Sequence, residues 1–152
     1  MKIEGSVALV TGANRGLGAA FCRTLLDRGA AKVYAAARNL QRLDHPGVVP
    51  VQLDVTSATD IAAAAASCGD VTLLINNAGI GTGTSALADD ALDAARREFE
   101  TNVYGPLALS RAFAPALAAN GGGAIVNVLS VLSWLSMPAS AGAKARLRAS
   151  GP

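Results

Sequence analysis

Short apolar runs of strand length alternate along the chain with alanine- and leucine-rich stretches of helical periodicity. The apolar runs predict strands at residues 7–10, 32–37, 49–53, 71–75 and 124–129. The periodic stretches predict helices at residues 16–28, 61–67, 88–97 and 98–119. This alternation is typical of a parallel sheet covered by helices on both faces. The pattern therefore predicts a doubly wound α/β domain with about five strands.

The ends of the helices and of the domain have signals of their own. Gly29 follows the first helix, where a glycine commonly ends a helix, and Thr56 or Ser57 can cap the second. Beyond residue 142 the α/β rhythm stops, and residues 143–152 are basic with few apolar positions. We expect one domain over residues 1–142, followed by an irregular basic tail.

Composition narrows the class of protein. A chain of 152 residues can bury one core, and 51% hydrophobic with only 16% charged residues argues against disorder. A net charge of +2 is too small for the basic face that nucleic-acid binding needs. The apolar runs are far shorter than the roughly 20 residues of a membrane-spanning helix. We expect a soluble protein with neither nucleic acid nor membrane as a partner.

The two cysteines and the N-terminus bear on the compartment. Cys22 and Cys68 have neither a CxxC nor a Cys/His spacing, and Cys22 falls on the apolar side of a predicted helix. Glu4 and Gly5 stand directly before the first strand, where a secretion signal would need a basic and then an apolar stretch. We expect structural thiols, no metal site and a reducing, cytoplasmic location.

A glycine-rich turn, residues 11–18 (TGANRGLG), joins the first strand to the first helix. Gly12, Gly16 and Gly18 can adopt positive φ, and without Cβ atoms they let backbone N–H groups and a helix N-terminus approach a pyrophosphate. We expect a larger side chain at any of the three to block that approach. The turn therefore predicts a dinucleotide site and makes the predicted domain one of the Rossmann type.

Further motifs follow the glycine-rich turn in order. They are Asp54-Val55 after the third strand, residues 76–79 (NNAG) after the fourth, Asn102 in the last helical region, and residues 125–130 (IVNVLS) in the fifth strand. Together these motifs resemble those of the short-chain dehydrogenase/reductase family, over residues 6 to about 140. The resemblance implies hydride transfer between a nicotinamide coenzyme and a small carbonyl or alcohol substrate, often by a homo-oligomer.

The resemblance also implies roles for individual residues. The pyrophosphate cradle corresponds to Gly12, Asn14, Arg15, Gly16, Leu17 and Gly18. The loop that supports the fourth strand and faces the adenosine ribose corresponds to Asn77, Ala78 and Gly79, while Asn76 is expected to brace the backbone of neighbouring strands. Asp54 resembles the residue that hydrogen-bonds the adenine amino group, with the N–H of Val55 beside it. A plainer interpretation makes Asp54 a turn or helix-cap acid.

Arg38 bears on the choice of coenzyme. At the end of the second strand an acid would accept a hydrogen bond from the ribose 2′-OH, whereas an arginine can pair with a 2′-phosphate. The chain has Arg38 and Asn39 there, and Arg15 adds a second cation. We expect NADP, with NADPH preferred over NADH. The alternative is that Arg38 is a solvated charge at a strand end.

Two residues resemble catalytic ones. Ser130 resembles the serine that hydrogen-bonds the substrate carbonyl, and Asn102 resembles the asparagine that organises a water in the proton relay. Each has a plainer interpretation, because Ser130 begins a serine-rich segment and a buried asparagine can satisfy a backbone group.

The family's general acid, a tyrosine followed four residues later by a lysine, would fall near positions 143 and 147. The chain has Ala143 and Leu147 there, and no tyrosine follows Tyr104. Tyr34, four residues before Arg38 on a strand, is expected on the coenzyme side. Loss of a positioned acid typically costs on the order of 10²–10⁴ in rate, and rescue by Lys144 is the weaker alternative.

Compared with the family, we expect this chain to be truncated before the last strands of the sheet. We therefore expect catalysis by this chain itself to be doubtful. The alternatives to an NADP-dependent oxidoreductase are a non-catalytic NADP(H)-binding domain and a truncated remnant.

Overall fold

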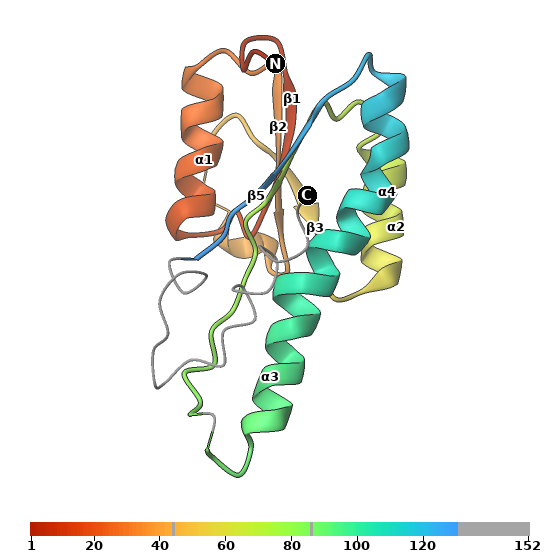
Figure 1. The fold of residues 1–152 in the computed structure, drawn as a ribbon. Coiled ribbons are helices and arrows are strands. Elements are labelled where there is room, and N and C mark those ends of the chain that lie inside the picture. The colour runs from red at the N-terminus through yellow and green to blue at the C-terminus, as the bar shows by residue number, and fades with distance from the viewer. Residues whose placement is uncertain (44, 86, 131–152) are drawn as a thin grey trace.

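Five parallel strands form the centre of the computed structural model, which describes residues 1–43, 45–85 and 87–130. The strands are β1 (Val7–Thr11), β2 (Lys32–Ala37), β3 (Val49–Gln52), β4 (Leu73–Asn76) and β5 (Ala124–Asn127). Their order in the sheet is β3-β2-β1-β4-β5, so the chain winds outward from β1 in both directions (Figure 1). The predicted doubly wound α/β fold is confirmed.

The helices lie on both faces of this sheet. They are α1 (Gly16–Asp27), α2 (Ala58–Ser67), α3 (Ala91–Phe99) and α4 (Gly105–Ala119), with a short 3-10 turn, η1 (Leu40–Arg42). In Figure 1, α1 covers one face and α2 and α4 cover the other. The five predicted strands and the first two predicted helices agree with the structure to within three residues at each end. The turn η1 lies in a segment that we predicted as loop.

The helices predicted at 88–97 and 98–119 form one continuous helical run. A π-helical turn, η2 (Glu100–Tyr104), joins α3 to α4, and the backbone at both of its ends keeps α-helical dihedrals. Pro106, the second residue of α4, has no N–H to donate to the carbonyl of Asn102, four residues earlier. The interruption of the α-helical pattern at η2 therefore has a cause in the sequence.

Each face of the sheet has its own apolar cluster. On one face Leu109 and Phe113 of α4 pack with Leu9 and Leu74 of the sheet and with residues of α2. On the other face Cys22 and Leu25 of α1 pack against strand residues that include Val10. The sheet is thus buried on both sides at its centre, as a parallel sheet requires.

Both cysteines are buried free thiols, one in each apolar cluster, as predicted. Burial raises the pKa of the Cys22 thiol to about 11 and also raises that of Cys68. These thiols are packing residues with little thiolate character at neutral pH.

Local signals act where the sequence places them. Gly29 adopts φ +80° just beyond Arg28, the C-cap residue of α1. Ser57, one of the two predicted caps, accepts a hydrogen bond from the Asp60 N–H at the start of α2. The predicted domain boundary at 142 and the basic tail lie outside the described residues. Over the described ranges no helix has both the length and the apolar character needed to cross a bilayer.

Candidate functional site

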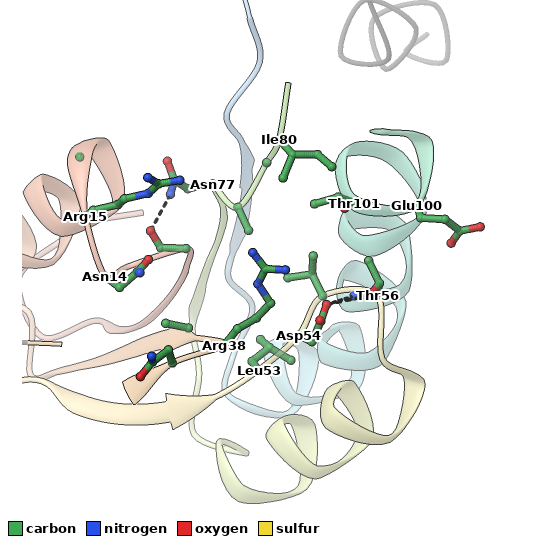
Figure 2. A pocket seen from close by; sticks show the side chains of 18 of the residues that line it. Asn14, Arg15, Arg38, Leu53, Asp54, Thr56, Asn77, Ile80, Glu100 and Thr101 are labelled. Carbon is green, nitrogen blue, oxygen red and sulfur yellow. Dashed lines mark hydrogen bonds between the residues drawn. The ribbon is translucent and has the colours of Figure 1, made fainter. Parts of the chain in front are cut away.

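A cavity of about 1270 Å³ opens at the carboxyl edge of the sheet, where β1, β2, β3 and β4 end. In an α/β sheet of this kind ligands bind at the carboxyl ends of the strands, near the point where the strand order reverses. All twelve residues predicted to bind the coenzyme line it: Gly12, Asn14, Arg15, Gly16, Leu17, Gly18, Arg38, Asp54, Val55, Asn77, Ala78 and Gly79. Figure 2 shows the labelled members converging from several elements.

The three glycines of the turn are required for different reasons. Gly12 and Gly16 have φ +66° and +54°, so the predicted positive φ is confirmed for both. It is wrong for Gly18, which lies in the first turn of α1 and is not among the residues of positive φ. A Cβ on Gly18 would come within 2.3 Å of the Gly12 carbonyl oxygen and 2.6 Å of Asn77 Nδ2. Gly18 is therefore needed for close packing of the turn.

Asn77 occupies the space that the glycines leave. Its Nδ2 donates to the carbonyl oxygen of Thr11 at 2.8 Å. It also donates to the carbonyl oxygen of Gly12 at 3.3 Å (Figure 2). The Thr11 hydroxyl oxygen accepts from the N–H groups of Asn77 and Ala78, both at 3.0 Å. These bonds tie the end of β4 to the end of β1 and fix the shape of the turn.

Asn76 bridges different elements. Its Nδ2 donates to Asn127 Oδ1 on β5 at 2.9 Å and to Ser110 Oγ on α4 at 3.4 Å. The expected bracing between neighbouring strands is present. The expectation that it acts on their backbone is wrong, because Asn76 and Asn127 are register partners whose side chains meet directly. Bracing of a backbone is instead the role of Asn77.

The first turn of α1 faces the cavity without a side-chain cap. Arg15 is the N-cap residue, its side chain forms no capping hydrogen bond, and the turn has no acidic residue. The first N–H groups of a helix have no partner within the helix and carry the positive end of its dipole. Because Gly16, Leu17 and Gly18 line the cavity, this end of α1 has the chemistry of an anion site.

Arg38 directly follows the last residue of β2 and projects into the cavity (Figure 2). Within the described ranges neither Arg38 nor Arg15 forms an ion pair. No carboxylate follows β2, since the next residue is Asn39. The end of β2 therefore presents a positive charge to the cavity, as the sequence predicted.

Asp54 is a turn acid, as one of its two interpretations predicts, and it also lines the cavity. Its Oδ1 accepts from the Thr56 N–H at 2.9 Å and from the Thr56 hydroxyl at 2.7 Å, which is an Asx turn. Partial burial opposes ionisation, but these bonds and the charge of Arg38 outweigh it and lower the pKa of the carboxyl. Asp54 is thus a turn acid and also an ionised group in the cavity wall.

The two residues predicted to be catalytic lie outside the lining of the cavity. Asn102 is 2% exposed in η2, where its Oδ1 accepts from the Ile80 N–H at 2.9 Å and its Nδ2 donates to the Ile80 carbonyl at 2.8 Å. The plainer interpretation of a buried asparagine that satisfies a backbone group is confirmed. Ser130 is half-buried just beyond β5, and positions 143–148 lie outside the described residues.

Tyr34 is not on the coenzyme side, so that expectation was wrong. Its hydroxyl donates to Asp70 Oδ1 at 2.9 Å, and Asp70 stands between α2 and β4, at the amino edge of the sheet. The two-residue period of a strand places Tyr34 and Arg38 on the same face of the sheet. It does not bring their side-chain ends to the same edge of the sheet.

Nine further residues line the cavity: Ala37, Asn39, Leu53, Thr56, Ile80, Arg96, Arg97, Glu100 and Thr101. The first five adjoin predicted motif residues, so proximity in sequence could have found them. The other four come from α3 and η2. Their spacing puts them on one helix face, but only packing decides that this face borders the cavity.

Comparison with known proteins agrees with this geometry. The family described as short chain dehydrogenase matches residues 6–146. A galactitol 2-dehydrogenase (L-tagatose-forming) from Cereibacter sphaeroides is 37% identical over 84% of this chain and 53% of its own length. An uncharacterized oxidoreductase from Methylorubrum extorquens is 35% identical over 92% of this chain and 60% of its own length. The chain thus spans roughly half to three-fifths of these relatives.

Among solved structures the chain is similar to a short chain dehydrogenase from Burkholderia cenocepacia, crystallised in complex with NADP. The two are 49% identical with a TM-score of 0.90, over 98% of this chain and 63% of the other. At this level of identity the likeness extends beyond the fold to the sequence of the shared region.

Proposed function

This chain belongs to the short-chain dehydrogenase family, and on that basis we propose that its cavity binds NADP and that the protein transfers hydride between NADPH and a small carbonyl or alcohol substrate. One observation carries the proposal. The glycine-rich turn, Arg38 and Asp54 are far apart in the sequence, yet they line a single cavity at the carboxyl edge of the sheet.

The residues present fit a dinucleotide. A Cβ on Gly12 or Gly18 would enter backbone or Asn77 atoms, so these glycines let the turn pack closely against the end of β4 beneath the cavity. The uncapped first turn of α1 supplies further donors for a pyrophosphate. Asp54, with its lowered pKa, would accept a hydrogen bond from the adenine amino group beside the N–H of Val55.

Arg38 is the basis for preferring NADP over NAD. A guanidinium can form paired, charge-assisted hydrogen bonds with a phosphate, and Arg38 forms no ion pair with the described residues. Arg15 lines the same cavity. The Burkholderia cenocepacia relative holds NADP, which supports the same choice of coenzyme here.

NADPH, when bound, would supply the hydride. For the protein's own residues we propose that the Ser130 hydroxyl hydrogen-bonds the substrate carbonyl. The side-chain amide of Asn102 already forms two hydrogen bonds with the backbone of Ile80. If Asn102 takes part in the proton relay, we therefore propose that it does so through its backbone carbonyl, to which Pro106 has no N–H to donate.

The test is a calorimetric titration of the 152-residue chain with NADPH, with NADH as the paired control. We expect micromolar binding of NADPH and binding of NADH weaker by about tenfold or more, because the 2′-phosphate adds a charge-assisted contact. No binding of either coenzyme would overturn the proposed function. Equal affinity would overturn only the preference for NADPH.

A second candidate is an NADP(H)-binding domain without turnover. It is favoured by one observation, that the chain has no tyrosine after Tyr104. Under conditions where NADPH binding has been demonstrated, NADPH oxidation is followed with a panel of aldehydes and ketones. Turnover supports the oxidoreductase, and its loss in Lys144→Ala would identify Lys144 as the replacement for the missing acid. Binding without turnover supports the second candidate.

A further inference from the structure

The segment of residues 80–82 leaves the end of β4 and is held against α3 and η2 by side chains of these helices. Asn102 pairs with both backbone polar groups of Ile80. Glu98 Oε1 accepts from the Thr82 N–H and from the Thr82 hydroxyl, both at 2.8 Å. Two helix side chains thus form hydrogen bonds with the backbone of this segment, as a neighbouring strand would in a sheet.

Glu98 and Asn102 stand four residues apart, one helical turn, and so present the same face. Both are buried, with exposures of 6% and 2%. The segment that they hold includes Ile80, which lines the cavity beside Thr101 of η2 (Figure 2). The bonds of Glu98 and Asn102 therefore act on one wall of the proposed coenzyme site.

Packing alone gives no reason for an acid at position 98. A buried carboxylate is costly unless it is paired or hydrogen-bonded, and Glu98 has no ion-pair partner among the described residues. Its hydrogen-bond partners among the described residues are the N–H and the hydroxyl of Thr82. Hydrogen bonds to an ionised acceptor are about twice as strong as neutral ones. Both hydrogen bonds of this buried acid therefore stabilise the position of a single residue of the segment, Thr82.

We infer that Glu98 is a positioning residue of the coenzyme site, which fixes residues 80–82 along α3 and so sets the place of Ile80 in the cavity wall. This inference rests on the proposed function for the identity of the ligand. The anchoring of the segment does not depend on that function and can be measured separately.

The central variant is Glu98→Ala in the full 152-residue chain, with amide hydrogen exchange and NADPH titration as readouts. We expect exchange of the Ile80 and Thr82 amides to be faster by about tenfold, and NADPH affinity to be weaker by a similar factor, because two charge-assisted bonds are lost. Exchange of the Leu9 amide, in the centre of the sheet, should not change.

Glu98→Gln separates positioning from a general loss of stability. The glutamine side-chain carbonyl can still accept from Thr82, so we expect both exchange and NADPH affinity to return to within about threefold of the parent chain. Asp90→Ala is the matched control, since it removes an exposed acid that forms no capping hydrogen bond at the start of the same helix. It should change neither readout.

Two results would overturn the inference: unchanged exchange at Ile80 and Thr82 in folded Glu98→Ala, or unchanged NADPH affinity despite faster exchange. If Glu98→Ala does not fold, Thr82→Val replaces it, because this change removes the hydroxyl donor and keeps the N–H. Should the parent chain bind no NADPH, the proposed function fails, and the exchange measurement still decides whether Glu98 anchors the segment.

Discussion

The two ends of β2 each carry a cation, and the two differ in their partners. Lys32, the first residue of the strand, donates from Nζ to Asp70 and, at 3.3 Å, to the hydroxyl of Tyr34, which itself donates to Asp70. Arg38, just beyond the other end, forms no ion pair with any described residue and faces the cavity. One strand thus connects a network of paired charges to a cation that forms no ion pair, although its charge helps to lower the pKa of Asp54.

The pKa shifts show how self-contained the network at the amino edge is. Hydrogen bonding from Lys32 lowers the pKa of the Asp70 carboxyl, while the same bond raises the pKa of Lys32. Burial, with the bond to Asp70, raises the pKa of Tyr34. All three groups are held in their ordinary charge states at neutral pH. We infer that this edge serves the fold and the carboxyl edge serves the ligand, a contrast that mutations can test.

The largest effect is expected for Gly18→Ala, at the carboxyl edge. Alanine normally stabilises a helix by about 1 kcal/mol relative to glycine, but here its Cβ would meet the Gly12 carbonyl oxygen at 2.3 Å. We expect thermal unfolding to show a loss of about 3 kcal/mol in the free energy of unfolding, as for severe overpacking, together with loss of NADPH binding.

Gly81→Ala is the control for crowding at Gly18. No atom lies within 4 Å of a Cβ at Gly81, and its φ is not positive, so its effect should stay within about 0.5 kcal/mol. A stabilised Gly18→Ala protein would show that the glycine-rich turn can relax, and that the narrow space is not what makes Gly18 necessary.

The next effect is expected for Arg38→Ala, which tests whether the cation that forms no ion pair serves the ligand. Loss of a charge-assisted contact to phosphate should weaken NADPH binding by about 10- to 100-fold. NADH affinity should change by less than about threefold, since the effect of Arg38 is assigned to the 2′-phosphate. Paired titrations with the two coenzymes measure this difference, and the melting temperature should stay within a degree or two.

Arg111→Ala removes an exposed arginine of α4 that does not line the cavity, and it should leave both affinities unchanged. A parallel loss of NADH and NADPH affinity in Arg38→Ala would instead assign Arg38 to a part of the coenzyme that both share. A marked fall in melting temperature would mean that Arg38 supports the fold, and the contrast between the two ends of β2 would disappear.

The smallest effect is expected for Asp70→Asn, at the amino edge. The side chains of Lys32 and Asp70 are 40% and 43% exposed, so we expect a loss of only about 0.5 kcal/mol at pH 7 by urea unfolding. NADPH affinity should not change. Asp93→Asn, which breaks the more exposed pair with Arg96, serves as the reference and should cost less.

The pH dependence sharpens this last prediction. Because the pKa of Asp70 is lowered in the folded protein from its ordinary value of 3.8, its contribution is present above that value. The contribution is lost as the pH falls below 3.8 toward the folded pKa. The stability difference between the parent chain and Asp70→Asn should therefore shrink below about pH 4. A difference that stays constant down to pH 2 would mean that the carboxylate charge is not what matters.

Most of the fold can be derived from patterns that act over a few residues. The β-branched runs, the glycine after α1 and the Ser57 cap are local features, and the structure uses each of them as predicted. The run from α3 to α4 was harder, because Pro106 perturbs it without breaking it. A proline in the first turn of a helix costs little, so its sequence position alone does not separate a new helix from a continued one.

In the candidate site, too, some residues could be predicted from local patterns and others could not. The predicted cavity residues follow directly after strands, and parallel strands bring their carboxyl ends to one edge by necessity. No such rule predicts that residues of α3 and η2 also line the cavity. Asp54 illustrates the mixed case, since the sequence offered a turn acid or a ligand residue. The structure confirms the turn acid and places the same carboxylate in the cavity wall.

The sequence by itself determined the strand and helix alternation, the glycine-rich turn and the cation at the end of β2, because each depends on backbone freedom or on alternation within a short stretch. Only the tertiary structure decided that Gly18 is needed for space, that Tyr34 points to the amino edge, and that Glu98 and Asn102 hold residues 80–82. The bonds of Tyr34, Glu98 and Asn102 join residues 36, 16 and 22 positions apart in the sequence, at distances fixed by packing.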